Sequence, residues 1–289
     1  MQIAPTRSAL LHLRIPFSFF LLPVFVFALS QSGEIDTTKT ILVFIIWHFL
    51  IYPASNGYNS YFDKDEGSIA LLEKPPLVDK SLYYWSLLLD FTAVLLSFFV
   101  GVGFAAAVLV YGLFSKLYSH PRIRLKKYPV ISFLIIFIFQ GAFVFWTSCI
   151  AISSTGIVWN IDFLTAGLVC SCFIGASYPL TQVYQHEEDA KRGDRTLSLM
   201  LGVKNSFLFS ASLFASGIAL LFFYWYSAGL LLFFWIFLLF AAIIGSAFLN
   251  WFLKVIKDEK KADFKNMTRM VAISSSAMLI YFTIIWLIS

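Results

Sequence analysis

Apolar residues fill nine long stretches of the chain, and polar or charged residues separate them. Each stretch predicts one membrane-spanning helix, because about 20 apolar residues cross the hydrocarbon core of a bilayer. None of them shows the alternation of a barrel strand, and a helix satisfies its own backbone hydrogen bonds in lipid. The predicted helices lie at 14–30, 41–62, 81–99, 101–118, 129–151, 163–186, 205–226, 229–253 and 268–288.

Two of these boundaries are less obvious from the pattern. The apolar run from 81 to 118 is too long for one crossing, so we place a break at the glycine-containing segment 100–103. The first run follows Arg7 and Arg14 and ends in small residues, which superficially resembles a cleavable signal peptide. Because eight more apolar runs follow, we expect it to be retained as the first helix.

The composition supports a membrane protein with a single domain. Hydrophobic residues make up 60% of the 289 residues and charged residues 13%, against about a quarter charged in an ordinary soluble domain. Nine spans leave roughly 109 residues for loops and ends, too few for a sizeable second domain, so we expect one domain over 1–289. Cys149, Cys170 and Cys172 lie inside apolar runs without metal-ligand spacing, and we expect them to be core residues.

The positive charges gather in loops that the predicted helices place on one side of the membrane. With the amino terminus in the cytoplasm, the loops near 63–80, 116–128, 187–204 and 254–269 share that side, and only Lys39 of the 21 lysines and arginines lies opposite. This asymmetry follows the positive-inside rule and predicts an outside carboxyl terminus. The net charge of +5 then reflects topology, and we expect no nucleic-acid partner. The short loops and the lack of a transit peptide suit a bacterial inner membrane.

Polar residues form a stripe at the end of the second predicted helix. At about 100° per residue, Asn56, Asn59, Asp63 and Glu66 fall within about 80° of one another. Pro53 comes just before them, removes a backbone donor and should bend the helix. Taken alone, such a stripe is typical of a helix end that faces water.

A second stripe follows Pro179 at the end of the sixth predicted helix. A continuing helix would bring six polar residues within about 60° of Gln185. They are Tyr178, Thr181, Gln182, Glu188, Asp189 and Arg192. Because both stripes lie on the cytoplasmic side behind a proline, two independent accidents explain them poorly. We therefore expect them to border a central cleft that opens to the cytoplasmic side.

The two stripes carry the oxygen ligands that Mg²⁺ prefers. This ion commonly binds through one or two carboxylates together with the phosphates of a substrate. Clustered acids repel phosphate unless divalent ions stand between them, so the stripes predict a magnesium-bound diphosphate. The basic loop 116–127 holds five cations that would clamp phosphate oxygens, although topology anchoring or contact with anionic lipid explains it equally well by itself.

These residues resemble the UbiA superfamily of intramembrane prenyltransferases over nearly the whole chain. That family has nine transmembrane helices and two aspartate-rich motifs, the first usually Asn-Asp-x-x-Asp-x-x-x-Asp and the second Asp-x-x-x-Asp. Asn59 and Asp63 match the first motif, and Gln185 and Asp189 fall on the second. The resemblance thus joins the two stripes into one expected site.

The chain departs from the family pattern at three carboxylates. Ser60, Gly67 and Gln185 stand where the motifs usually have aspartate. Asp65, Glu66, Glu187 and Glu188 lie close enough to substitute, and Glu66 and Glu188 face the proper side on helical geometry. The ligand set is therefore open, and a catalytically inactive member of the family is one alternative.

The resemblance implies Mg²⁺-dependent transfer of an isoprenyl chain from an allylic isoprenyl diphosphate to a lipophilic acceptor, with release of diphosphate. The expected catalytic residues are Asn59, Asp63, Gln185 and Asp189. The expected metal ligands are these four with Glu66 and Glu188. The expected substrate-binding residues are Asn56, Tyr118, Arg122, Arg124, Lys126, Tyr178, Lys191 and Arg192. The implied acceptors are a quinone-precursor ring, placed first as the commonest, a lipid glycerol phosphate, a tetrapyrrole or a carotenoid.

Two other interpretations stay open from the sequence. Asp90 lies about nine residues into the third helix, and an acid at such depth is a functional hypothesis by default. It would orient the acceptor or take its proton, or else hydrogen-bond a neighbouring helix.

An ion-coupled transporter would also use acids near broken helices, but it would hold them near the bilayer midplane rather than at the membrane edge.

Overall fold

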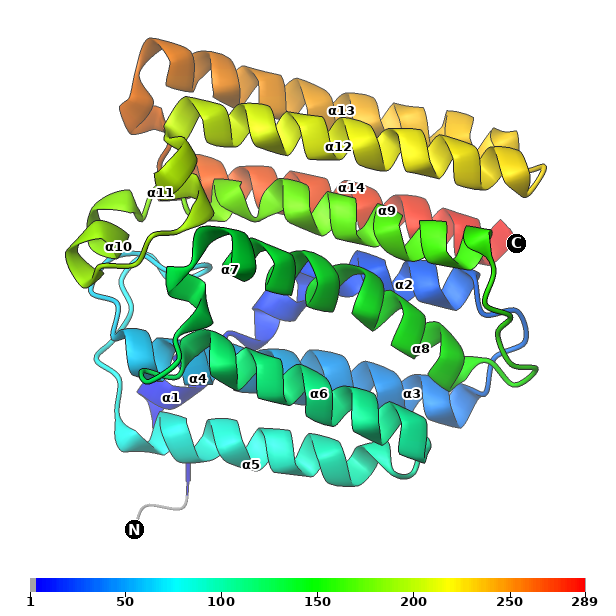
Figure 1. The fold of residues 1–289 in the computed structure, drawn as a ribbon, viewed down its shortest axis with the longest axis horizontal. Helices are drawn as coiled ribbons and strands as arrows, with labels where there is room; N and C mark the ends of the chain where they lie inside the picture. The colour runs from blue at the N-terminus through cyan, green and yellow to red at the C-terminus, as the bar shows by residue number, and fades with distance from the viewer. Residues whose placement is uncertain (1–3, 289) are drawn as a thin grey trace.

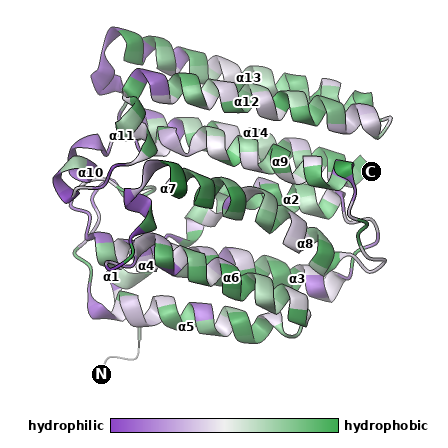
Figure 2. Cartoon of the chain, viewed as in Figure 1, coloured by the Kyte–Doolittle hydropathy of each residue, from purple (hydrophilic) through white to green (hydrophobic). Residues whose placement is uncertain are grey.

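The computed structural model describes residues 4–288, which are almost entirely helical. Long helices run side by side along the longest axis of the molecule (Figure 1). Hydrophobic residues cover most of their length, whereas hydrophilic residues collect mainly at the end of the bundle that carries α10 (His186–Arg192) and α11 (Leu197–Leu201), as Figure 2 shows. The expected all-α membrane protein is confirmed.

Seven helical runs within residues 4–288 are long and apolar enough to cross a membrane. Three of them are built from shorter elements. The run 37–63 consists of α3 (Thr37–Ile45), η2 (Ile46–Ile51) and α4 (Tyr52–Asp63). The run 129–152 consists of α7 (Pro129–Ile136), η4 (Phe137–Phe143) and α8 (Val144–Ile152), and the run 161–181 consists of α9 (Ile161–Ser177) and η5 (Pro179–Thr181). The other four are α6 (Val102–Ser119), α12 (Val203–Ser227), α13 (Leu231–Lys257) and α14 (Phe264–Ile288). Short 3-10 turns, η3 (Leu125–Lys127) and η6 (Glu259–Lys261), occupy two of the connections.

The count of nine crossings is not confirmed by these helices. A bent pair that joins 7–20 to α2 (Leu22–Ser30) would be an eighth span, with a bend of 42°. The third predicted helix, 81–99, is α5 (Lys80–Ser97), which is not among these spans. It lies beside α4 but is less apolar because it carries Lys80, Asp90 and aromatic residues with polar groups. The break predicted near 100–103 is present, since α5 ends at Ser97 and α6 begins at Val102.

The first apolar run differs from the single helix that its pattern predicts. Residues 14–30 form a 3-10 helix η1 (Ile15–Phe20) followed by α2, and a further short helix, α1 (Arg7–Leu13), precedes them. Arg14 separates α1 from η1 in a left-handed conformation, with φ of 46° and ψ of 47°. Pro16 and Pro23 each stand in the first turn of the element that follows the break, where the missing N–H costs nothing.

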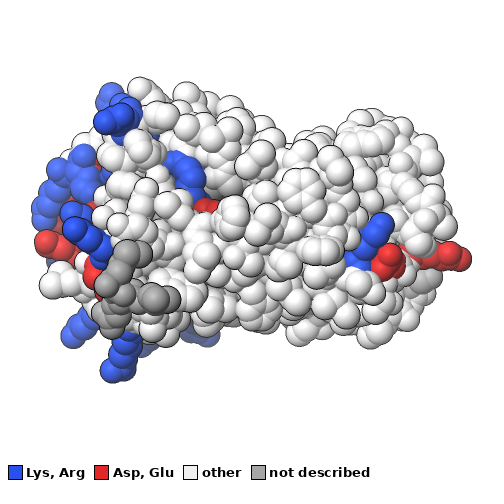
Figure 3. All heavy atoms as spheres, turned by 90° about the horizontal axis from the view of Figure 1, so that it is seen from below, with Lys and Arg blue, Asp and Glu red and all other residues white. Residues whose placement is uncertain are grey.

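The second half of the first run packs into the core of the bundle. α2 packs against α8 and α14, and the buried Phe27 stacks on Phe282 at 4.3 Å between ring centroids and contacts Phe145 at 5.1 Å. The three cysteines are free and buried, as expected. Lysine and arginine side chains gather at one end of the molecule (Figure 3), and α14 ends at the opposite end (Figure 1).

Candidate active site

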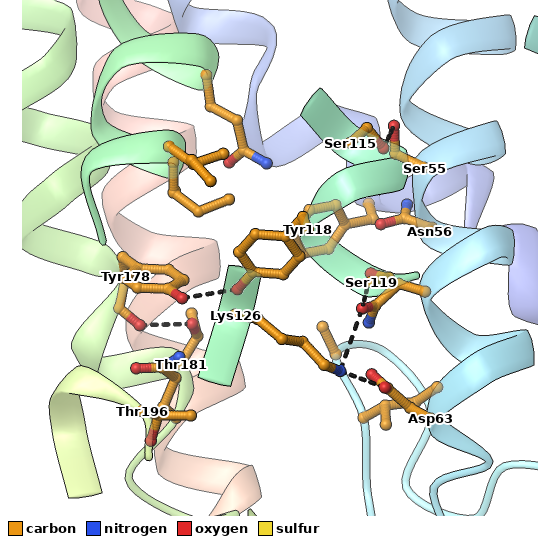
Figure 4. A pocket seen from close by; sticks show the side chains of 18 of the residues that line it. Ser55, Asn56, Asp63, Ser115, Tyr118, Ser119, Lys126, Tyr178, Thr181 and Thr196 are labelled. Carbon is orange, nitrogen blue, oxygen red and sulfur yellow. Dashed lines mark hydrogen bonds and ion pairs between the residues drawn. The ribbon is translucent and has the colours of Figure 1, made fainter. Parts of the chain in front are cut away.

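A cavity of about 280 Å³ lies at the basic end of the bundle, between α4, α6, α7, α9 and the segment that follows α9. Its walls change character along its length. Asp63 and Lys126 (Figure 4) mark the polar part together with Asn59, whereas Phe114 and Phe139 belong to the apolar part. The cavity thus offers a charged end and a hydrophobic end to one ligand.

α4 carries three of the four residues of the first stripe to the cavity wall. Asn56, Asn59 and Asp63 line the cavity from the last turns of that helix. The helix ends at Asp63, and Lys64 caps it in a left-handed conformation with φ of 52°. Glu66 therefore lies in an exposed loop, and the expectation that helical geometry turns it toward the other three was wrong. The predicted disturbance before Pro53 takes the form of the π-helical segment η2.

The second stripe reaches the cavity without a continuous helix. α9 ends at Ser177, a single 3-10 turn follows from Pro179, and α10 begins only at His186. The helix predicted over 163–186 is therefore present as a span over 161–181, but its continuation to 186 was wrong. Proline cannot donate the next helical hydrogen bond, which explains the break. The chain nevertheless brings six stripe members to the cavity wall: Tyr178, Thr181, Gln182, Gln185, Asp189 and Arg192.

Glu188 does not line the cavity and instead links the two acid-bearing segments. Its carboxylate accepts hydrogen bonds from the backbone N–H groups of Glu66, at 2.9 Å, and Gly67, at 3.5 Å. A Cβ at position 67 would lie 2.6 Å from Glu188 Oε2. The glycine that replaces a motif aspartate therefore leaves the space that this contact needs. Gln185 adds a second link, since its side-chain N–H donates to the Ser68 carbonyl oxygen at 3.1 Å.

Asp63 is held by the basic loop. The carboxylate, on a residue that is 9% exposed, forms an ion pair with Lys126 and lies 3.4 Å from Arg124 Nη2. The side-chain oxygen of Asn59 accepts hydrogen bonds from Ser119, at 2.6 Å, and from Lys126, at 3.5 Å. Figure 4 shows Lys126 reaching toward Asp63. Two predicted substrate-binding cations, Arg124 and Lys126, thus lie beside a predicted metal ligand.

Asp189 is paired within its own short helix and joined to the first segment through Arg192. Arg192 Nη2 lies 2.9 Å from Asp189 Oδ1, and Nη1 forms an ion pair with Asp65. Burial raises the pKa of Asp189 to about 6, even though Arg192 opposes the shift. Burial alone would lower the pKa of Arg192, but the charges of Asp65 and Asp63 raise it. The guanidinium therefore stays charged between two carboxylates from different segments.

Asp194 completes the network and was not predicted. Arg124 donates to both of its carboxylate oxygens at 2.7 Å, and Arg192 Nε lies 3.7 Å from Oδ2. Burial would raise the pKa of Asp194, but the hydrogen bonds from Arg124 lower it below its usual value. One chain of contacts therefore runs from Asp63 through Arg124, Asp194 and Arg192 to Asp189.

The remaining candidates lie away from the cavity wall. Arg122 and Lys191 are exposed and do not line it, so their contact with substrate stays a prediction. Asp90 forms an ion pair of 2.5 Å with Lys116 of the neighbouring α6, which favours the helix-pairing interpretation. His186, which was not a candidate and is not on the cavity wall, hydrogen-bonds Ser198 at 2.8 Å.

Some of the tyrosines near the two acid-bearing segments line the cavity and others do not. Tyr118 and Tyr178 line the cavity and share a hydrogen bond of 2.7 Å between their hydroxyl groups, as Figure 4 shows. Tyr184 also lines it, whereas Tyr58 and Tyr61 are not on its wall. Tyr118 and Tyr178 come from α6 and the end of α9, so their contact closes the polar part of the cavity on one side.

The donor set suits Mg²⁺, although it is not arranged as a finished metal site. Within residues 4–288, no three side chains of the His, Cys, Asp and Glu types surround one position. Hard oxygen donors are nevertheless available on the wall from Asn59, Asp63 and Asp189, and the buried side-chain oxygen of Gln182 has no hydrogen-bond partner among the described residues. Lys126 and Arg192 now neutralise the two carboxylates, so a divalent ion would have to exchange with them.

Comparison with solved structures finds the same fold in several proteins. A structure reported for digeranylgeranylglyceryl phosphate synthase is similar over 98% of this chain and 99% of its own, with a TM-score of 0.64 and 20% identity. A UbiA homologue from Archaeoglobus fulgidus bound to DMAPP and Mg²⁺ is similar over 98% and 100% of the two chains, with a TM-score of 0.71 and 16% identity. The same homologue bound to GPP and Mg²⁺ gives a TM-score of 0.71 over 96% and 99%.

The family assignment rests on sequence. Among curated proteins, none matches the chain. The model of the UbiA prenyltransferase family, however, matches residues 20–282, which include both acid-bearing segments, the basic loop and all the long helices except the end of α14. The chain is an integral membrane protein and belongs to the UbiA prenyltransferase family.

Proposed function

We propose that the protein transfers an isoprenyl chain from an allylic isoprenyl diphosphate to a lipophilic acceptor and releases diphosphate, with Mg²⁺ as cofactor. One observation carries this proposal: buried carboxylates and bases from two distant segments meet at the polar end of a cavity whose other walls are apolar. A diphosphate with a hydrocarbon tail has the same division of charged and apolar parts. Related structures bound to DMAPP or GPP together with Mg²⁺ support the choice.

The charge balance of the site supports the need for a divalent cation. The cavity wall carries four carboxylates, from Asp63, Asp65, Asp189 and Asp194, against three cations, from Arg14, Lys126 and Arg192. Carboxylates on the wall are therefore in excess by one. Such a site repels a free diphosphate, and bound metal ions reverse that repulsion.

The cavity residues supply binding and charge compensation for the reaction. Asn59, Asp63 and Asp189 would hold Mg²⁺, with Gln182 and Gln185 as further oxygen donors. The bound ion would neutralise the charge that develops on the leaving diphosphate. Lys126 and Arg192, released from their carboxylates, would donate hydrogen bonds to phosphate oxygens.

The transfer itself breaks one bond and forms another. The bond between the allylic carbon and the diphosphate oxygen breaks, and its electron pair leaves with the diphosphate. A nucleophilic atom of the acceptor bonds to that carbon and loses its proton to water at the polar end. The rings of Tyr118 and Tyr178 stand on the cavity wall where their faces would stabilise the allylic cation.

The proposal extends to the identity of the acceptor and to the membrane that holds the protein. A quinone-precursor ring is the first acceptor to test, and a lipid glycerol phosphate is the second, supported by the likeness to digeranylgeranylglyceryl phosphate synthase. The gathering of basic residues at one end (Figure 3) supports a cytoplasmic amino terminus and cytoplasmic site, in keeping with a bacterial inner membrane.

The decisive experiment uses purified protein in lipid vesicles with labelled isoprenyl diphosphate, Mg²⁺ and a panel of acceptors. We expect diphosphate release and a lipid-soluble labelled product, both abolished by a chelator and restored by Mg²⁺. Movement of the intact diphosphate across the vesicle without bond cleavage would identify a transporter. Tight Mg²⁺-dependent binding without product for any acceptor would identify an inactive member of the family.

A further inference from the structure

An uncharged polar side chain, Gln140, stands on the apolar part of the cavity wall. It is the twelfth residue of the 24-residue span 129–152, so it lies near the middle of that span. Eleven residues separate it from the start of α7 at the basic end, which is about 16 Å along a helix. A carboxamide at such depth costs free energy unless it is hydrogen-bonded, and polar residues inside a membrane commonly mark functional sites.

The backbone around Gln140 is arranged to hold it on that wall. Gln140 belongs to the π-helical segment η4, and such wide turns are rare and frequent at functional sites. The two residues that follow pack on α9. A Cβ at Gly141 would lie 2.4 Å from the Ser171 Cα, and the Ala142 N–H donates to the Ser171 hydroxyl at 2.9 Å. The contact with α9 therefore fixes the wide turn while Gln140 lines the cavity.

The neighbours of Gln140 on the wall are mainly aromatic. The Phe114 and Phe139 ring centroids lie 4.5 Å apart, and the Tyr111 centroid lies 6.1 Å from that of Phe139. Tyr111 is buried, and its hydroxyl lies beside the Gln140 side chain. Aromatic faces favour a flat ring, and a carboxamide offers both hydrogen-bond donors and an acceptor. An aromatic molecule with an uncharged oxygen matches this part of the cavity.

A hydrocarbon tail has a better place in the molecule. A second cavity of about 200 Å³ adjoins the first, and its wall, which includes Phe173 and Phe214, is mainly apolar. The serines Ser274 and Ser275 on that wall donate to backbone carbonyl oxygens at 3.1 and 3.3 Å. An isoprenyl tail there leaves no polar group worse off, whereas against Gln140 it would leave the amide without hydrogen bonds. The two cavities share five wall residues: Phe20, Ile174, Ser177, Val271 and Ser275.

We propose that Gln140 hydrogen-bonds a hydroxyl or carbonyl oxygen on an aromatic acceptor ring that lies against Phe114 and Phe139. Tyr111 and Tyr118 are seven residues apart on α6, about 10 Å along the helix. A ring held at Gln140 therefore extends toward Tyr118, where the allylic carbon would lie. The inference rests on the proposed prenyl transfer and narrows its acceptor to oxygen-bearing aromatic rings. It makes Gln140 a specificity-determining residue.

The first test measures binding of simple rings without diphosphate or Mg²⁺. Equilibrium dialysis in one detergent would compare 1-naphthol with naphthalene, which has the same ring system and lacks the hydroxyl. We expect 1-naphthol to bind about fivefold or more tightly, as one additional hydrogen bond allows. Equal binding of the two probes would overturn the proposal.

The second test repeats this ratio in variants. Gln140→Met keeps the length of the side chain without the amide and should bring the ratio close to one, whereas Gln140→Asn should restore part of it. Thr147→Val is the matched control, because Thr147 lies in the same span but not on the cavity wall. An unchanged ratio in folded Gln140→Met protein would contradict the assignment. If that variant fails to fold, the wild-type ratio and the competition described below decide.

Tyr111→Phe separates direct binding from a positioning role. This variant removes the hydroxyl beside Gln140 and keeps the aromatic wall. We expect it to retain most of the preference for 1-naphthol, because Gln140 itself makes the hydrogen bond. A loss as large as that in Gln140→Met would show that Gln140 acts through Tyr111, and would overturn the proposal.

Competition then tells the acceptor from the tail. Geranyl S-thiolodiphosphate with Mg²⁺ is a donor analogue whose carbon–sulfur bond resists cleavage. We expect 1-naphthol to bind beside it with little change in Kd, and competitive displacement would assign the Gln140 region to the tail and overturn the inference.

The outcomes for this inference and for the proposed function are distinguishable. Mg²⁺-dependent diphosphate release by wild-type protein, with equal ratios in wild type and Gln140→Met, would remove the inference alone. No such release, with the preference for 1-naphthol present in wild type and lost in Gln140→Met, would remove the proposed function alone.

Discussion

Asp63 is the last residue of a long helix, whereas Asp189 belongs to a seven-residue helix that follows a break in the chain. Both carboxylates line one cavity and both are neutralised by cations, but from different sources. Lys126 and Arg124 come to Asp63 from another loop, while Arg192 pairs with Asp189 from the next turn of its own helix. The first position is therefore fixed by tertiary contacts and the second mainly by local ones.

This difference suggests how metal and diphosphate would enter. Freeing the Asp63 carboxylate for a metal ion requires breaking its contacts with the basic loop. Freeing the Asp189 carboxylate requires only that the Arg192 side chain turn toward Asp65 or a phosphate. Arg192 already contacts both segments. We infer that Arg192 is the cation most easily transferred to the substrate.

The largest expected effect comes from removing either carboxylate. Asp63→Ala and Asp189→Ala should each lower kcat for prenyl transfer by about 10²–10³-fold, because each removes charge stabilisation at the leaving diphosphate. Diphosphate release measured in lipid vesicles would quantify the loss, and melting temperature would check that the fold persists. Nearly full activity in both variants would exclude these residues from the site.

The second largest effect is expected from removing Lys126, the partner that Asp63 receives from another segment of the chain. Lys126→Met should lower kcat/KM for the isoprenyl diphosphate by about 10–100-fold, since a charge-assisted hydrogen bond is lost and Asp63 becomes unpaired. Lys127→Met, which changes the neighbouring lysine that does not line the cavity, is the matched control. Equal effects of the two substitutions would show that the loop acts through its overall charge rather than through the Asp63 contact.

A pH profile tests the local pairing of Asp189. Its pKa of about 6 means that the carboxyl group is mostly protonated below that pH, and a protonated group is a poor ligand for Mg²⁺. The apparent Mg²⁺ affinity should therefore be constant above pH 7 and should fall about tenfold between pH 7 and pH 5. Equilibrium dialysis would measure it, and Asp189→Asn should remove this step. A wild-type profile that stays flat through pH 6 would contradict the assignment.

The sequence predicts the long helices and many of the site residues better than it predicts the contacts between them. Apolar runs of about 20 residues set the long helices, because only lipid crossing explains them, and the spacing of Asn59 and Asp63 is correct because α4 continues to Asp63. The same 100° rule fails after Pro179 and Lys64, where local backbone breaks end the helices. Asp194 and Arg14 lie outside both stripes, and only the folded chain brings them to Arg124 and Asn56.

The smallest effect concerns the link between the two segments. Gly67→Ala would place a Cβ 2.6 Å from Glu188 Oε2 and should push that carboxylate off the backbone N–H groups of Glu66 and Gly67. We expect a few-fold loss of kcat and no change in the acceptor preference, because Glu188 joins the segments without lining the cavity. Glu188→Ala should cause a similar loss. In the double variant the clash no longer exists, so the two losses should not add, and a coupling of about 1 kcal/mol is expected for groups in contact. Fully additive losses would show that position 67 and Glu188 act separately, and that the spacing of the two carboxylates does not depend on this contact.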